Sequence, residues 1–184
     1  KHNSVLESIS MTGTPFMGNE LLTRKLATCK SLTRINLSRC DLTDYAVNQL
    51  FRLPDLKTLI IDDNQQVEFS TSNLLKHEQS ISYESDSEYE DIRTLLMDGY
   101  KSLETLSIMH IVPCEEGVEI LRKLPGLKHL NMMQAGDRSL TPTQFLQLLQ
   151  SDSLKVLDVR GHSLLKNSTE VNNAISTSNI QVRL

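Results

Sequence analysis

A pattern of aliphatic residues recurs along most of the 184-residue chain and constrains its fold more than any other feature. Five strong copies of the form L-x-x-L-x-L begin at Leu32, Leu56, Leu103, Leu127 and Leu154. A weaker copy begins at Leu6, and a partial copy begins at Asn179. Successive copies begin 26, 24, 47, 24, 27 and 25 residues apart. A spacing that is nearly constant over so many copies indicates structural repeats that stack on one another.

Each copy predicts one short β-strand. In its second half, apolar residues alternate with other residues, as they do in a strand that buries one face. A single layer of this kind cannot bury its apolar side alone, so successive layers must stack as parallel strands. Between the copies, four segments have apolar residues at helical spacing, namely NELLTRKLATCKSL, TDYAVNQLFRLPDL, EEGVEILRKLPGL and TPTQFLQLLQSDSL.

Capping and stop signals support these helices. Thr43, Thr141 and Ser168 have the hydroxyl group that favours an N-cap, and Pro54 and Pro125 stand where two of the helices should end. Because each helix is longer than a turn and covers the outside of its strand, we expect the strand side to be concave and the helix side convex. The whole chain, residues 1–184, is therefore predicted to be one α/β domain of about seven strands.

The copies and their period resemble the leucine-rich-repeat family over nearly the whole chain. The resemblance implies a solenoid with a curved parallel sheet on the concave side and helices on the convex side. Full helices and a period of 24 to 27 residues are similar to the ribonuclease-inhibitor-like and cysteine-containing subclasses. Cys40 matches the ladder position of the second subclass, but other copies place Asn64, Ile111, Ala135 and His162 there. The subclass therefore stays open.

The repeats are also similar to those of substrate receptors in cullin-type ubiquitin ligases, including F-box and zyg-eleven-type proteins. This resemblance implies that the repeats would recognise a substrate protein. The adaptor-binding box of such a receptor would lie outside this chain.

The 47-residue step contains no further L-x-x-L-x-L copy, which favours an acidic insertion near residues 77–91 over a complete hidden repeat. Residues 84–91 contain five carboxylates and no basic residue, and without these charges the net charge of −4 would be +1. Such segments are usually solvated. The alternative is a regulatory or docking loop, in which Ser85 and Ser87 are candidate phosphorylation sites because each has an acidic residue three positions on.

Residues that flank the buried strand positions are predicted to face solvent on the concave side, where they are candidate partner-binding residues. Ile60, Met109 and Met133 are apolar at positions where the core does not require it, which favours a protein interface. The alternative is that single exposed apolar residues are normal on any protein surface. The candidates are Arg34, Asn36, Thr58, Ile60, Asp62, Thr105, Ser107, Met109, His129, Asn131, Met133, Asp158 and Arg160.

Motifs for catalysis, cofactors and metals are absent from the sequence. It has no Gly-rich phosphate loop, G-x-S-x-G or H-E-x-x-H, and Cys29, Cys40 and Cys114 form no C-x-x-C pair. We therefore expect no enzyme activity, no cofactor and no metal site. The acidic net charge disfavours nucleic acid as a partner, and no apolar run is long enough for a membrane span. Few, widely spaced cysteines favour an intracellular protein, either cytoplasmic or nuclear.

These features predict a protein–protein interaction module that binds its partner on the concave face. Its sharper form is the substrate-recognition part of a cullin-type ubiquitin ligase. Two alternatives remain: a structural or signalling scaffold of cytoskeletal or regulatory type, and a non-catalytic accessory domain of a larger enzyme. Because the last strand, NIQVRL, has no polar cap after it, we also expect a further domain or partner chain at the C-terminal edge.

Overall fold

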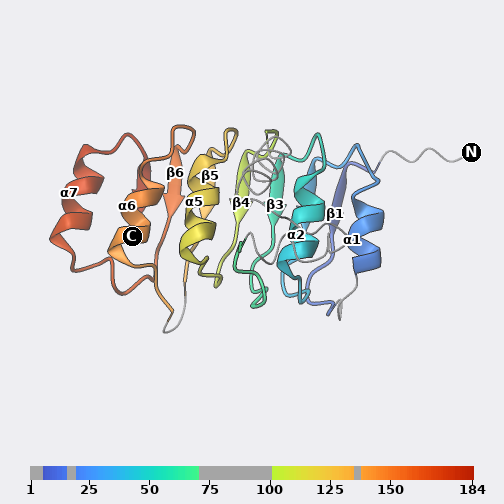
Figure 1. Ribbon diagram of the computed structural model, residues 1–184, viewed down its shortest axis with the longest axis horizontal. Helices are drawn as coiled ribbons and strands as arrows, with labels where there is room; N and C mark the ends of the chain where they lie inside the picture. Colours follow the sequence, from blue (N-terminus) through green and yellow to red (C-terminus); the bar gives the residue numbers. More distant parts are fainter. Residues whose placement is uncertain (1–5, 16–19, 71–100, 135–137) are drawn as a thin grey trace, which may run out of the picture.

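A computed structural model describes residues 6–15, 20–70, 101–134 and 138–184. In these ranges seven strands form one all-parallel sheet, and five helices lie along one side of it (Figure 1). The strands are β1 Ser8–Ser10, β2 Arg34–Asn36, β3 Thr58–Ile60, β4 Thr105–Ser107, β5 His129–Asn131, β6 Val156–Asp158 and β7 Gln181–Arg183. The helices are α1 Glu20–Leu26, α2 Asp44–Phe51, α5 Glu115–Lys123, α6 Pro142–Leu148 and α7 Thr169–Thr177.

The strands pair in the order in which they occur in the chain, and the central residue of each strand pairs with that of the next. Most members of this central row are fully or almost fully buried, and those from Ile35 to Leu157 are at most 2% exposed. The predicted α/β class and the parallel sheet are thus confirmed, with the aliphatic copies in register. From β1 to β7 the row consists of Ile9, Ile35, Leu59, Leu106, Leu130, Leu157 and Val182.

The long step in the repeat spacing adds no strand between its two neighbours. β3 pairs directly with β4, and Leu59 lies opposite Leu106 although 47 residues separate them. Leu59 and Leu106 therefore belong to adjacent layers of the sheet. The acidic insertion near residues 77–91, with Ser85 and Ser87, lies outside the described residues.

Three helices begin at the N-caps that the sequence predicted. The hydroxyl groups of Thr43, Thr141 and Ser168 each accept a hydrogen bond from the backbone N–H three residues further on. The N-cap of α5 was not predicted, because it is Cys114, whose sulfur accepts from the N–H of Gly117 at 3.4 Å. Oxygen-bearing side chains are the usual N-caps, so a cysteine in this position gives no sequence signal.

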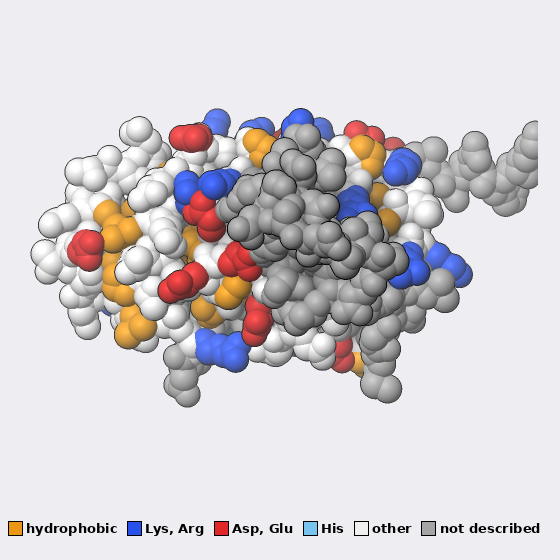
Figure 2. All heavy atoms as spheres, in the orientation of Figure 1, with side chains coloured by type: hydrophobic (Ala, Val, Ile, Leu, Met, Phe, Trp, Pro, Cys, Tyr) orange, Lys and Arg blue, Asp and Glu red, His pale blue; other side chains and the backbone are white. Residues whose placement is uncertain are grey.

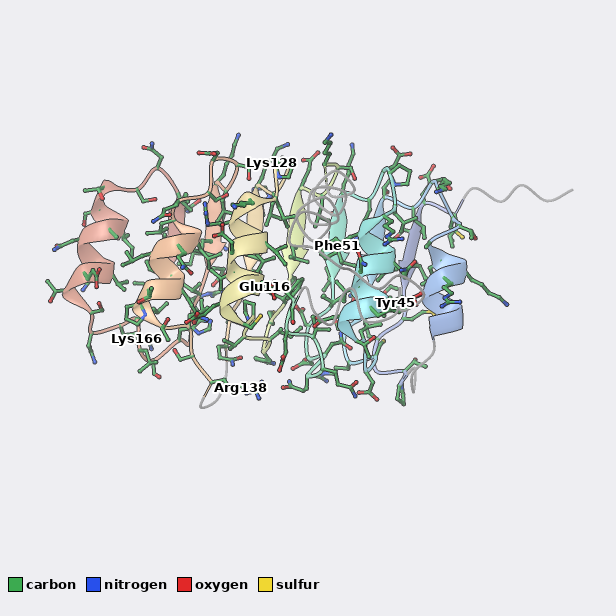
Figure 3. The ribbon with its side chains drawn as sticks, viewed as in Figure 1. Tyr45, Phe51, Glu116, Lys128, Arg138 and Lys166 are labelled. Atoms are coloured by element: carbon green, nitrogen blue, oxygen red, sulfur yellow. The ribbon has the colours of Figure 1, made fainter. Side chains whose placement is uncertain are left out.

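The helices cover one face of the sheet (Figure 1), where α1 packs against α2, α5 against α6, and α6 against α7. Tyr45 of α2 lies beside α1 (Figure 3), where the Nε of Arg24 donates to its hydroxyl group at 3.1 Å. The guanidinium carbon of Arg24 also lies 5.8 Å from the centre of the tyrosine ring. This contact joins the first two helices by a hydrogen bond and a cation–π interaction.

Apolar helix residues and the central strand row form one core. Leu50, Val118, Leu121, Phe145 and Leu148 are at most 1% exposed and belong to the same cluster as the strand residues. Burial of each such side chain stabilises the fold by about 1.5–3 kcal/mol. Residues on either side of each central strand residue point away from the helices, and the face that they form is called the open face.

At the ladder position of the repeats, a buried asparagine binds the backbone of its own layer and of the preceding one. Asn64 is fully buried, and its side-chain oxygen accepts from the N–H groups of Cys40 and Leu42 at 3.0 and 2.9 Å. Its amide group donates to the carbonyls of Leu37 and Ile61 at 3.0 and 2.8 Å. One side chain thus satisfies four buried backbone groups.

In other layers the residue at the ladder position binds the backbone through a different side chain. His162 is 1% exposed, and its Nδ1 accepts from the N–H of Leu140 at 2.9 Å. Its Nε2 lies 2.7 Å from the carbonyl oxygen of Met132. Cys40 donates its thiol to the carbonyl of Met11 at 2.9 Å, and burial raises the pKa of this thiol. Ala135 lies outside the described residues.

Candidate binding site on the open face

The predicted partner-binding residues form three rows across the open face. One row precedes the central strand residues, one follows them, and one lies just beyond the ends of the strands. Eleven of the thirteen are exposed or half-buried. Ser107 and Asp158 differ from the expectation, because they are only 8% and 6% exposed.

Several polar side chains of the open face bind the backbone of their own strand. The side-chain oxygens of Asn36 and Asn131 accept from the N–H groups two residues on, in Ser38 and Met133, at 3.1 and 3.2 Å. Asx side chains commonly hold a turning backbone in this way. These two residues therefore shape the strand ends, and their acceptor oxygens are already in use.

The negative charge of Asp158 is neutralised by arginines of the same chain, so it is not available to a partner. Its carboxylate accepts from the Nε and Nη2 of Arg160 at 2.9 and 2.8 Å, and Nη1 of Arg183 lies 3.8 Å away. Burial alone would raise the pKa of Asp158, but the hydrogen bonds and charge of Arg160 hold it below its usual value. The predicted role of Asp158 as a partner contact is therefore replaced by that of an internal anchor for Arg160.

Asp62 has a different arrangement in the middle of the open face. Its Oδ1 accepts from the hydroxyl group of Ser107 at 2.7 Å and from the N–H of Met109 at 2.8 Å. Asn131 donates to the same hydroxyl group at 3.1 Å. Within the described part of the chain, Oδ2 of Asp62 accepts no hydrogen bond and the carboxylate has no ion pair. Asp62 is thus fixed in place by one oxygen while the other stays available.

A row of turn residues borders the open face just beyond the strand ends. Gly13, Arg39, Asp63, His110 and Gly161 occupy equivalent places in the layers of β1, β2, β3, β4 and β6, and all five have a positive φ between 58° and 88°. This left-handed conformation is uncommon for residues other than glycine. It turns the side chains of the three central members toward one another along the border of the sheet.

These three side chains form an ion-pair cluster. Asp63 accepts from Nε of Arg39 at 3.0 Å and from Nδ1 of His110 at 2.5 Å. Partial burial raises the pKa of Asp63, but the hydrogen bonds from His110 and Arg39 hold it below its usual value. The carboxylate of Asp63 is therefore ionised and engaged on both oxygens at neutral pH.

The open face is hollowed where this cluster meets the row of candidates that lies just beyond the strand ends. A pocket of about 490 Å³ lies at the carboxyl ends of β1 to β4. Of the predicted candidates it includes Asp62 and Met109. Gly13, Arg39, Asp63 and His110 were not predicted, because the sequence argument ended three residues past the central row, at the position that Thr12 and Ser38 share with Asp62 and Met109. The pocket is lined by Thr12, Gly13, Ser38, Arg39, Asp62, Asp63, Met109 and His110.

The three apolar candidates lie in or near this pocket. Ile60, Met109 and Met133 are half-buried, so part of each side chain contacts solvent on the open face. Arg34 and His129 are exposed, and Nδ1 of His129 lies 3.5 Å from the hydroxyl group of Thr105. The centre of the open face thus combines partly exposed apolar side chains with one available carboxylate.

A second hollow lies on the helix side. It is a groove of about 650 Å³ between α6 and α7, with Leu146, Leu149, Ala174 and Ile180 among its lining residues. Hydrophobic side chains gather over this end of the helix face (Figure 2). Lys128 and Arg138 mark the opposite long edges of the molecule (Figure 3).

None of the helices in the described ranges combines the length and apolar character needed to span a bilayer. No group of three or more His, Cys, Asp or Glu side chains in the same ranges is arranged to hold a metal ion.

No protein-family model matches the chain, and no curated protein is significantly similar to it in sequence. Its function is therefore inferred from the positions and contacts of its residues.

Proposed function

We propose that this chain is a leucine-rich-repeat solenoid that binds a protein partner on its open face, which is the concave face expected from the sequence. The observation that carries the proposal is the grouping of Ile60, Met109 and Met133 around the available carboxylate of Asp62. Partly exposed apolar residues with a polar border are typical of protein interfaces. Methionine adapts its shape readily and is frequent on such surfaces.

Solenoid geometry supports the choice of face. Stacked repeats present an extended surface made of equivalent positions from successive layers, and such surfaces commonly bind proteins or peptides. The in-register row from Ile35 to Leu157 places the candidate residues at regular intervals across neighbouring strands. A polypeptide laid across the strands would therefore meet one set of side chains in each layer.

Binding is proposed in preference to catalysis because the polar groups of the pocket are arranged as ion pairs and backbone anchors. His110 and Asp63 do form a hydrogen-bonded pair of the kind that orients a general base. A hydrolase of that type also needs a hydroxyl or thiol nucleophile on the other ring nitrogen. In the described residues no such group is hydrogen-bonded to Nε2 of His110.

The sharper form of the proposal is substrate recognition for a cullin-type ubiquitin ligase. It rests on the resemblance of the repeats alone. Co-precipitation of a cullin adaptor with the protein isolated from its own cells is the expected result. Failure of that protein to bind any cullin adaptor would remove this form and leave open-face binding untouched.

The experiment that tests open-face binding is a quantitative pull-down from cell extract with the native sequence and three variants. Met109→Asp and Met133→Asp place a charge on the open face, whereas Leu164→Asp makes the same kind of change at a residue that is 55% exposed in the loop after β6. We expect both methionine variants to lose the specific partner and Leu164→Asp to retain it. Retention by all three variants would contradict the proposal.

A scaffold that binds through its acidic segment is the second candidate. Five carboxylates in residues 84–91 favour it. Deletion of residues 77–91 would abolish partner capture under this alternative and leave it intact under open-face binding. The same pull-down therefore separates the two proposals.

A further inference from the structure

We propose that the pocket at the carboxyl ends of β1 to β4 receives a lysine side chain of the bound polypeptide, with its ammonium group on Oδ2 of Asp62. The inference rests on the proposed function, because it names the chemistry by which a partner on the open face would be recognised. The lysine is expected to enter from the open face, between the row just beyond the strand ends, which contains Asp62 and Met109, and the bordering ion-pair cluster.

Charge is the first argument. The pocket contains four ionisable side chains, namely Arg39, Asp62, Asp63 and His110. Arg39 and His110 both donate to Asp63, so that carboxylate is already engaged. Asp62 is the other carboxylate of the pocket, and within the described chain it has no ion pair. A positively charged group of a partner would therefore complement Asp62.

The second argument is that Asp62 is held in position before a ligand arrives. Its Oδ1 is fixed by two donors, the hydroxyl group of Ser107 and the N–H of Met109. Ser107 is itself held by Asn131, and it is only 8% exposed. A group that is already ordered loses little conformational freedom on binding, so a contact to it contributes more to affinity.

Lysine fits this arrangement better than arginine. A guanidinium group binds a carboxylate most strongly through two parallel hydrogen bonds to both oxygens. In Asp62 one oxygen already accepts two hydrogen bonds, so only Oδ2 is available to a ligand. An ammonium group is a compact charge that needs one oxygen. Met109, half-buried at the side of the pocket, supplies an apolar surface for the methylene stem of the lysine.

The test begins with a random-peptide phage library selected on the immobilised native domain. Peptides that bind are synthesised, and each lysine is replaced in turn by norleucine, which keeps the stem without the charge, or by arginine. Dissociation constants are measured for the native domain, Asp62→Asn, Asp63→Asn, Met133→Asp and the control Asp152→Asn. Asn at position 62 retains an oxygen that can accept from Ser107 and Met109, so the fold of this variant is preserved and is checked by thermal unfolding.

We expect the selected peptides to share one lysine whose change to norleucine weakens binding about tenfold or more. Asp62→Asn should cause a similar loss and should make the norleucine peptide no worse than the lysine peptide. Arginine should bind more weakly than lysine. Asp152→Asn is the matched control, because it removes an exposed carboxylate on the helix side, outside this pocket, and the preference for lysine should persist.

The outcomes separate this inference from the proposed function. Peptides that lose binding with Met133→Asp but bind Asp62→Asn and the native domain equally would overturn the lysine pocket and leave open-face binding standing. Peptides indifferent to both changes would overturn both. A preference for lysine that disappears with Asp63→Asn and persists with Asp62→Asn would place the charge recognition on the wrong carboxylate.

Discussion

His162 and Asn64 satisfy buried backbone hydrogen-bonding groups with different side chains. Each lies at the ladder position, each is buried, and each accepts a hydrogen bond from a backbone N–H while donating to a carbonyl. Because a backbone N–H can only donate, Nδ1 of His162 must be unprotonated and Nε2 must carry the proton. The imidazole of His162 is therefore neutral in the folded chain, which is consistent with the lowering of its pKa by burial.

Removal of the His162 ring should destabilise the domain strongly. His162→Ala leaves the N–H of Leu140 and the carbonyl of Met132 buried without a partner, each at a cost of about 1–3 kcal/mol. We expect a loss of about 2–5 kcal/mol in the free energy of unfolding, measured by urea denaturation. His162→Asn supplies an acceptor and a donor, as at Asn64, and should lose less. Equal losses for the two variants would show that ring volume, and not hydrogen bonding, dominates.

The same residue predicts a pH dependence of stability. Burial lowers the pKa of His162 in the folded state, while the hydrogen bond to Met132 raises it to a smaller extent. The unfolded chain, with a histidine pKa of about 6.5, therefore binds more protons than the folded chain below that pH. Stability should be constant above about pH 7.5 and should fall as the pH drops through about 6.5 toward the folded pKa, by at most about 1.4 kcal/mol per pH unit. In His162→Asn this component should vanish, and an unchanged profile would assign the pH dependence to other groups.

At the scale of elements, the left-handed turns at the strand ends set the border of the open face. Three of them are formed by Arg39, Asp63 and His110, whose positive φ values carry a steric cost that glycine would avoid. The contacts of Arg39 and His110 with Asp63 offset part of this cost. The equivalent turns at Gly13 and Gly161 have no side chain, so the cluster is confined to the layers of β2, β3 and β4.

Gly13 and Gly161 provide a matched pair for measuring what these turns require. Both have a positive φ, +68° and +88°, but a Cβ at Gly161 would lie 1.8 Å from the carbonyl oxygen of Gln134, whereas a Cβ at Gly13 meets nothing within 4 Å. We expect Gly13→Ala to cost about 1–2 kcal/mol, from backbone strain alone. Gly161→Ala should cost clearly more, because the backbone at Gln134 must also move.

Thermal and urea unfolding of the two glycine variants would measure this difference. If Gly161→Ala were as stable as Gly13→Ala, the layers of β5 and β6 would have to be less tightly packed than the structure shows. The comparison therefore tests the spacing of two neighbouring turns as well as the role of glycine.

At the scale of the whole molecule, stability is shared along a row of layers. Leu106 is fully buried at the centre of β4 and pairs with Leu59 on one side and Leu130 on the other. Met109 lies three residues further on, is half-buried and faces the pocket. The two residues are close in sequence, but one holds adjacent layers together and the other contributes to the open face.

Charge substitutions at these two residues should have opposite outcomes. Leu106→Asp buries an unpaired carboxylate, at a cost of several kcal/mol, which is comparable to the whole stability of a domain of this size. We expect it to abolish folding, measured by loss of the cooperative unfolding transition and of the circular dichroism signal. Met109→Asp should remain folded, with a change in stability of about 1 kcal/mol or less. Unfolding by Met109→Asp would contradict the assignment of faces.

Local sequence patterns were sufficient to predict the layers. The strand positions, the buried central row and the N-caps at Thr43, Thr141 and Ser168 follow from local rules, since an alternating strand or a capped helix depends on residues only a few positions apart. The direct pairing of β3 with β4 was favoured for the same reason, because the intervening segment contains no further copy of the pattern.

Contacts between layers establish which open-face residues are available to a partner, and these contacts could not be predicted from the sequence. Asp62 and Asp158 are equally acidic in the sequence, yet Asp158 is neutralised by Arg160 and Arg183, whereas Asp62 keeps one free oxygen in the described chain. That difference depends on groups brought together from separate layers, such as Ser107, which is 45 residues from Asp62. The spacing of a repeat defines which layers are neighbours, but the hydrogen bonds and ion pairs between them depend on backbone conformations and side-chain positions that no single copy specifies.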